Sequence, residues 1–273
     1  MSRFRAACVQ LRSSDDPAEN VRVASQLIRE ARGAGADFIS TPENTNLMAP
    51  DGGAKLELSW PEDKDPALPA FQHLAEEIGA WLLIGSLAIK VSDHQTANRS
   101  FLISPRGAIA ARYDKIHLFD VDLPSGEQYR ESRTVAGGME ATTADLPWGR
   151  IGLSVCYDLR FPQLYRALAR QGAFALTVPS AFTETTGKAH WHVLLRARAI
   201  ENGAFVIAAA QGGLHANGRR TYGHSLIVSP WGEILAEAGT DPGIVLAEID
   251  PGEAAAARVR IPSLKHDRAF NGP

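Results

Sequence analysis

The sequence predicts an α/β protein in which helices cover mixed β-sheets. Short apolar, strand-like segments alternate with amphipathic helical segments along most of the chain. Two pairs of strand-like segments flank the turns Pro105-Arg106-Gly107 and Pro230-Trp231-Gly232, which predicts β-hairpins. Strand-helix-strand connections favour parallel pairing and hairpins require antiparallel pairing, so the sheets should be mixed. No linker or low-complexity stretch divides the chain, and we expect one domain over residues 1–273.

The elements of the first half follow from apolar spacing. Spacings of three and four residues predict helices, and short apolar runs predict strands. Asp15-Asp16-Pro17 starts the first helix with acidic caps and a first-turn proline, and the helix ends near Gly33-Ala34-Gly35. In chain order we predict a strand at 4–11, this helix, a strand at 37–40, a helix at 68–78, a strand at 81–89 and hairpin strands at 100–104 and 108–112.

The second half continues the alternation. Gly172 and Gly203 each end a predicted helix. We predict a strand at 151–155, a helix at 162–171, a strand at 173–178, a helix at 190–202, a strand at 204–210, hairpin strands at 225–228 and 234–236, and a last strand at 244–249. Two long irregular segments remain, at 44–65 and 120–139, and loops of such length in a compact domain are often functional.

Composition limits the classes of partner. The net charge is -3 and no long run of like charges occurs, which disfavours nucleic acid and anionic membranes as partners. The N-terminus lacks the apolar stretch of a signal peptide, and no segment holds the roughly 20 apolar residues needed to span a bilayer. The only two cysteines, Cys8 and Cys156, suggest free thiols in a reducing compartment. We expect a cytoplasmic protein with a small-molecule partner.

Cys156 is the strongest candidate nucleophile. It closes the predicted strand at 151–155 and precedes a turn into the helix that begins near Pro162, which is a strand, nucleophile, turn, helix order. Backbone N–H groups at a helix N-terminus favour a thiolate over a thiol. The alternative is a buried structural cysteine, the interpretation that we give to Cys8, which lies inside an apolar strand.

A cysteine hydrolase also needs a base and a group that stabilises negative charge. Glu43 directly follows the predicted strand at 37–40, where an α/β sheet presents ligands. Lys115 lies among apolar neighbours and could stabilise an oxyanion. Taken singly, Glu43 could be a surface turn residue and Lys115 an edge-strand lysine. His190 and His192 do not have the i, i+4 spacing of helical metal ligands, so we expect no metal.

Taken together, these residues resemble a known family, the nitrilase or carbon-nitrogen hydrolase superfamily, whose pattern is a Glu, Lys and Cys triad in this chain order. The resemblance covers nearly the whole chain. The motifs that carry it are Pro42-Glu43, Tyr113-Asp114-Lys115-Ile116-His117-Leu118, Cys156-Tyr157-Asp158-Leu159-Arg160-Phe161-Pro162, Ala189-His190-Trp191 and Asn202-Gly203. Three separated motifs in the proper order are far more specific than any one of them.

The resemblance implies a four-layer α-β-β-α sandwich with two mixed sheets, and association into a homodimer or a higher homo-oligomer. It also implies an amidase mechanism without a cofactor. Glu43 would take the proton of Cys156, whose sulfur attacks the amide carbon, while Lys115 and the Tyr157 backbone N–H hold the oxyanion. A thioester would form and then be hydrolysed by water. The competing class is a catalytically silent binding protein of the same fold.

The resemblance implies further site residues. A second glutamate near the triad would be Glu131, with Glu127 as the alternative. Arg160 matches a position that binds the distal carboxylate of acid amides, a task that suits the guanidinium fork, although a surface salt bridge would explain it equally well. Phe182 and Thr186 match positions that line the same pocket.

Within the superfamily, the sequence resembles the branch that contains deaminated glutathione amidase and ω-amidase, through the Cys156 motif and Thr186-Gly187. The segments that favour the first of these are Arg196-Ala197-Arg198-Ala199-Ile200-Glu201, Ala209-Ala210-Gln211, His215 and Tyr222-Gly223-His224-Ser225. The resemblance therefore implies an amide of an α-keto dicarboxylate as the substrate, with deaminated glutathione first and α-ketoglutaramate second. A neutral nitrile suits a carboxylate-binding arginine less well.

Overall fold

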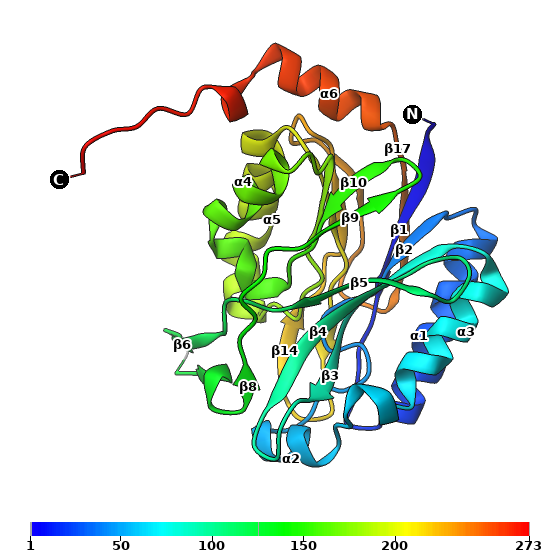
Figure 1. Ribbon diagram of the computed structural model, residues 1–273. Helices are drawn as coiled ribbons and strands as arrows, with labels where there is room; N and C mark the ends of the chain where they lie inside the picture. Colours follow the sequence, from blue (N-terminus) through cyan, green and yellow to red (C-terminus); the bar gives the residue numbers. More distant parts are fainter. Residues whose placement is uncertain (1, 125, 273) are drawn as a thin grey trace.

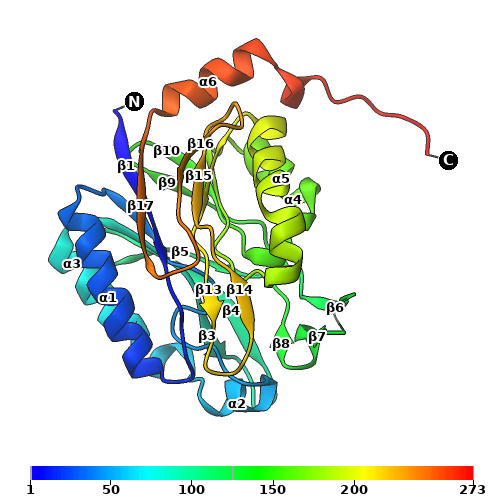
Figure 2. The same ribbon diagram turned by 180° about the vertical axis from the view of Figure 1, so that it is seen from behind.

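Two mixed β-sheets face each other, and helices cover their outer faces. The computed structural model describes residues 2–124 and 126–272. Figure 1 shows the α1 and α3 pair on one side and the α4 and α5 pair on the other, and Figure 2 shows the same layers from behind. Along the described ranges, no helix is both long and apolar enough to cross a membrane.

The first sheet has the strand order β17-β1-β2-β3-β4-β5, with β8 paired to β4. Its strands are β1 (Phe4–Gln10), β2 (Phe38–Ser40), β3 (Trp81–Lys90), β4 (Thr96–Ile103), β5 (Ile109–Asp114), β8 (Val135–Ala136) and β17 (Gly243–Ile249). β1, β2 and β3 run parallel, and β17, β4 and β5 pair antiparallel to their neighbours. The carboxyl ends of the parallel strands therefore meet at one edge.

The second sheet has the order β16-β15-β12-β11-β10-β9. Its strands are β9 (Thr143–Leu146), β10 (Gly149–Gly152), β11 (Ala175–Thr177), β12 (Phe205–Ala208), β15 (Leu226–Val228) and β16 (Ile234–Glu237). β10, β11 and β12 run parallel. Two small hairpins lie outside both sheets, β6 (Asp120–Asp122) with β7 (Gln128–Arg130) and β13 (Gly212–Leu214) with β14 (Arg220–Tyr222).

Six α-helices complete the layers: α1 (Pro17–Gly33), α2 (Gly52–Glu57), α3 (Ala67–Ile78), α4 (Pro162–Arg170), α5 (Glu184–Asn202) and α6 (Pro251–Arg260). α1 starts where the sequence predicts, because the Asp16 carboxylate accepts hydrogen bonds from the N–H groups of Ala18 and Glu19. α6 crosses one end of the sandwich (Figure 1). Short 3-10 turns include η2 (Glu131–Arg133) and η3 (Cys156–Arg160).

The core divides into two clusters, as the alternation along β1 requires. Ala7 and Val9 point toward α1 and α3 and belong to the outer cluster of the first sheet. Ala6 and Cys8 point the other way, into the cluster between the two sheets, which also takes in α4 and α5. Cys8 is fully buried there, which agrees with its prediction as a core residue.

Both predicted hairpins and the order of the predicted elements are present, and several features differ from the predictions. α5 begins at Glu184 rather than at residue 190, because the Thr183 hydroxyl caps it by accepting the Thr186 N–H. The strand predicted at 151–155 ends at Gly152. The long segments 44–65 and 120–139 contain α2 and, in the second, the β6-β7 hairpin and η2, which are short and have little apolar periodicity. Sequence spacing also did not predict β9, the β13-β14 hairpin or α6.

Candidate active site

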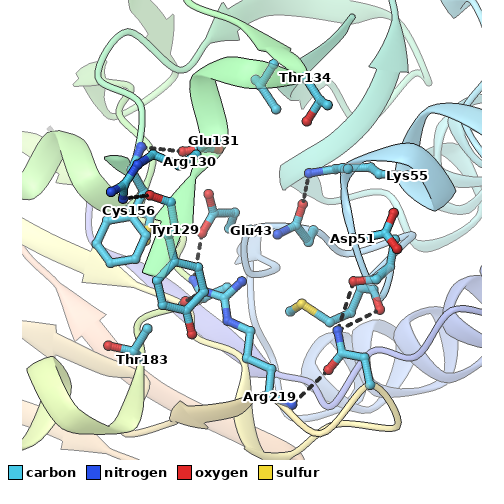
Figure 3. A pocket seen from close by; sticks show the side chains of 18 of the residues that line it. Glu43, Asp51, Lys55, Tyr129, Arg130, Glu131, Thr134, Cys156, Thr183 and Arg219 are labelled. Carbon is cyan, nitrogen blue, oxygen red and sulfur yellow. Dashed lines mark hydrogen bonds between the residues drawn. The ribbon is translucent and has the colours of Figure 1, made fainter. Parts of the chain in front are cut away.

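A cavity of about 700 Å³ opens where the carboxyl ends of strands from both sheets meet, and the four predicted catalytic residues line it. Glu43 follows β2, Lys115 follows β5, Glu131 opens η2 and Cys156 opens η3. Because these strands point their carboxyl ends at the same region, residues far apart in sequence become neighbours. Figure 3 shows Glu43, Glu131 and Cys156 around this cavity.

Lys115 lies between the two glutamates. Its Nζ donates hydrogen bonds to Glu43 Oε1 at 2.9 Å and to Glu131 Oε2 at 2.8 Å. Asn98, on β4, donates from Nδ2 to Glu43 Oε1 at 2.7 Å and to Glu131 Oε1 at 3.3 Å. The second Glu43 oxygen accepts the Ala181 backbone N–H at 2.9 Å. Both carboxylates are therefore held in fixed orientations by buried donors.

Cys156 has a backbone conformation that few residues other than glycine adopt, with φ of 49°. Its backbone N–H donates to Pro179 O at 2.9 Å, which ties the turn to the strand-end segment after β11. The side chain is 7% exposed and lines the cavity. A sharp, strained turn between strand and helix presents a nucleophile in this way.

The electrostatics favour charged Glu43 and Lys115 beside a neutral Cys156. Burial opposes charge on Glu43, but the adjacent Lys115 ammonium outweighs it and holds the pKa of the carboxyl at about 2. Burial likewise opposes charge on Lys115, but Glu131 and Glu43 raise its pKa well above the usual range. Burial and the Glu43 charge raise the pKa of the Cys156 thiol. The raised pKa favours the protonated thiol in the free protein, whereas the helix N-terminus favours the thiolate.

Asp158 fixes the turn that carries Cys156, and sequence reasoning did not single it out. Its Oδ2 accepts the Val155 N–H at 2.8 Å and the Tyr113 hydroxyl at 2.7 Å. Its Oδ1 accepts the His117 N–H at 3.0 Å and lies 2.7 Å from His117 Nδ1. Tyr113 and His117 flank Lys115 in sequence. The fully buried carboxylate thus joins the segment that carries Cys156 to the one that carries Lys115.

We expect Asp158→Ala to destabilise the protein by about 3 kcal/mol or more, because it leaves several buried donors without an acceptor. We expect kcat to fall while KM changes little, since Asp158 does not line the cavity. Thermal unfolding and steady-state kinetics check both effects. Tyr113→Phe removes only one of the donors and serves as the milder variant. An Asp158→Ala protein of wild-type stability and turnover would contradict this positioning role.

The other predicted residues fall into two groups. Tyr157, Phe182 and Thr186 line the cavity, as the sequence predicts. Glu131, and not Glu127, accepts the Lys115 hydrogen bond, since Glu127 accepts from the Tyr129 and Thr185 hydroxyls.

Arg160 is absent from the cavity lining. Its guanidinium stands 5.9 Å from the centre of the Tyr157 ring and 5.3 Å from that of Phe182, two residues that line the cavity. Nη1 lies 3.3 Å from His190 Nδ1. The binding of a substrate carboxylate by Arg160 stays a prediction.

Two cations that sequence reasoning missed do reach the cavity. Lys55, on α2, donates from Nζ to Asn44 Oδ1 at 2.9 Å, and burial lowers its pKa. Arg219, just before β14, donates from Nη2 to Ala181 O at 2.7 Å and stacks 5.2 Å from the centre of the Tyr129 ring. Its buried Nε has no hydrogen-bond partner among the described residues. Figure 3 shows both side chains in the pocket that Glu43 enters.

A layered fold with a thiol, two glutamates and a lysine in one cavity is the arrangement of a cysteine-type carbon-nitrogen hydrolase. The chain belongs to the carbon-nitrogen hydrolase family, whose model matches residues 5–259. This confirms the family and the enzyme class predicted from the sequence.

Relatives extend over nearly the whole chain. The deaminated glutathione amidase of Synechocystis is 43% identical, and the match covers 97% of this chain and 98% of that protein. The crystal structure of the C. elegans NitFhit protein is similar with a TM-score of 0.92 and 35% identity, over 98% of this chain and 66% of that one. These matches confirm the α-β-β-α sandwich.

A third similar structure is a mutant of the amidase from Nesterenkonia sp. AN1. It has a TM-score of 0.83 and 25% identity, and the match covers 97% of this chain and 94% of that one. It shows covalent addition of the acetamide moiety of fluoroacetamide at the active site cysteine of that amidase.

Proposed function

We propose that this protein is an amidase that hydrolyses deaminated glutathione, cleaving its α-keto dicarboxylate amide through a thioester on Cys156. The observation that carries the proposal is the buried Glu43-Lys115-Glu131 chain beside Cys156. The similarity to deaminated glutathione amidases over nearly the full length supports the choice of substrate.

In the proposed mechanism, Glu43 takes the Cys156 proton as the sulfur attacks the amide carbon. A concerted transfer fits the neutral thiol of the free protein. Lys115 Nζ and the Tyr157 backbone N–H stabilise the oxyanion. Glu43 then gives the proton to the leaving nitrogen, the C–N bond breaks and a thioester remains. Water, deprotonated by Glu43, attacks the thioester, and the C–S bond breaks to release the acid and restore the thiol. Glu131 orients Lys115.

The cavity favours an extended, acidic substrate over a compact one. Its volume of about 700 Å³ falls within the range of pockets that hold drug-sized ligands. Deaminated glutathione carries one carboxylate on its α-keto acyl part and another at its glycine end. Neither Lys55 nor Arg219 forms a salt bridge within the described parts of the chain. We assign these two cations to the glycine-end carboxylate and Arg160, after its side chain turns, to the acyl carboxylate.

This assignment predicts a substrate-dependent effect. Lys55→Met and Arg219→Met should each lower kcat/KM for deaminated glutathione roughly 30-fold, equivalent to about 2 kcal/mol for a lost charge partner. The compact α-ketoglutaramate lacks the glycine end, so its kcat/KM should change little. Arg160→Ala should lower kcat/KM for both substrates.

The matched control for Arg219→Met is Arg220→Met, since Arg220 is adjacent but exposed and does not line the cavity. Equal losses on both substrates in the Lys55 and Arg219 variants would contradict the assignment. Faster turnover of α-ketoglutaramate than of deaminated glutathione by the wild type would instead favour the ω-amidase alternative.

We also propose that the chain acts as one domain in a cytoplasmic homodimer. Val193 on α5 is 68% exposed and Trp231 is 53% exposed, and an apolar face of this kind favours association. Light scattering of the dilute protein should give twice the chain mass. A monomer that retained full activity would contradict this proposal.

A further inference from the structure

A cluster of two histidines and a glutamate lies outside the cavity. His192 comes from α5, His224 from the segment between β14 and β15, and Glu237 from the end of β16. His192 Nε2 lies 2.9 Å from Glu237 Oε1, and His224 Nδ1 lies 2.8 Å from the same oxygen. All three possible ligand atoms lie within 4.8 Å of one another. Sequence spacing could not reveal this cluster, because its members come from three elements.

The backbone holds the cluster in place. His224 has a left-handed conformation with φ of 54°, its N–H donates to Gly239 O at 2.8 Å, and its carbonyl accepts the Trp191 indole N–H at 2.8 Å. Trp191 is fully buried and directly precedes His192. One contact therefore fixes the positions of both histidines relative to each other.

The pairing of β15 with β16 and the Tyr222 ring also position the three side chains of the cluster. Glu237 pairs in register with Leu226, two residues after His224. The Tyr222 ring stacks on His224 with centroids 4.3 Å apart and meets His192 edge-on at 5.8 Å. α5 approaches Tyr222 through Gly187, where an added Cβ would lie only 2.3 Å from the Tyr222 side chain. The three side chains thus converge on a scaffold that is already closely packed.

We propose that His192, His224 and Glu237 form a binding site for a divalent transition-metal ion of the Zn²⁺ class. Two imidazole nitrogens and one carboxylate oxygen match the donor preference of such ions, whereas Mg²⁺ and Ca²⁺ prefer oxygen alone. A slight lengthening of the two distances from the histidine nitrogens to Glu237 Oε1 makes room for the ion between these three ligand atoms. The half-exposed histidines leave a further coordination position for water.

The ion would link α5 to the edge formed by β15 and β16. Thr183 caps α5 and Thr186 lies in its first turn, and both line the cavity. A ligand that binds only the folded chain raises its stability according to its concentration and affinity. A bound ion would therefore stabilise α5, the helix that borders the cavity. The site does not depend on the substrate proposed above.

The test is a titration of metal-free protein with Zn²⁺ by calorimetry. All variants carry Cys156→Ala, so that the cavity thiol cannot bind zinc, and Cys8 is buried in the core. We expect one ion per chain with micromolar affinity. His192→Gln and His224→Asn should each weaken binding about tenfold or more. Asparagine is chosen at position 224 because it tolerates the left-handed backbone.

His190→Gln is the matched control, since this exposed histidine lies on the same helix outside the cluster. It should bind Zn²⁺ as the parent does. As a second readout, Co²⁺ should give visible d–d absorption in the parent and in His190→Gln but not in His192→Gln. Absence of stoichiometric binding in the parent would overturn the proposal. Unchanged affinity in both His192→Gln and His224→Asn would also overturn it.

Discussion

Cys156→Ser is expected to abolish amide hydrolysis and to leave the fold intact. Serine fits the same space, but its hydroxyl is a far weaker acid than a thiol. We expect turnover to fall roughly 10⁴-fold or more, as when other enzymes lose their nucleophile. Amine release from deaminated glutathione, measured beside thermal unfolding, gives both quantities.

Cys8→Ala is the control for this experiment. Cys8 is buried between the sheets and donates to Leu226 O at 3.9 Å. Its replacement should lower the melting temperature through a lost core contact and leave kcat unchanged. Full activity in Cys156→Ser would contradict the enzyme mechanism, and a catalytically silent binding protein would then describe the chain better.

Glu43→Gln and Lys115→Ala are expected to reduce turnover by roughly 10²- to 10⁴-fold each, and the double variant by little more than the worse single one. The two side chains share a buried hydrogen bond, so removing either one disables the other. Steady-state kinetics of both single variants and the double variant check this. If the two losses simply multiplied, the proposed joint action would be wrong.

A loss of stability in Lys115→Ala would also lower its measured turnover. Without the ammonium, Glu43 and Glu131 face each other across a buried site, which typically costs about 3–5 kcal/mol of stability. Thermal unfolding must therefore accompany the kinetics, which are measured well below the melting temperature. Lys188→Ala is the matched control, since this lysine is exposed and pairs only with Glu184 on the same helix. It should keep wild-type turnover.

The sequence predicts those parts of the site that follow regular elements. Glu43, Lys115 and Cys156 each come after an apolar strand, and the structure places all three in one cavity. Asn98 and Asp158 escape prediction because their importance depends on hydrogen bonds to distant residues rather than on a local pattern.

Residues on irregular segments are the least predictable. Lys55 lies on α2, inside a segment predicted only as a long loop, and Arg219 precedes a strand of three residues. Arg160 shows the converse case. Its position in a motif indicates a role in binding, but motif spacing does not reveal that its guanidinium lies beside the rings of Tyr157 and Phe182.

Mass spectrometry of protein quenched with acid during turnover detects the proposed thioester on Cys156. With deaminated glutathione, the peptide that contains Cys156 should gain the mass of the α-ketoglutaryl group in the wild type. The adduct should be reduced in Glu43→Gln, which lacks the base that takes the thiol proton, and it should be absent from Cys156→Ser. Continued product formation with an unmodified Cys156 peptide, or with the acyl group on another residue, would contradict the account.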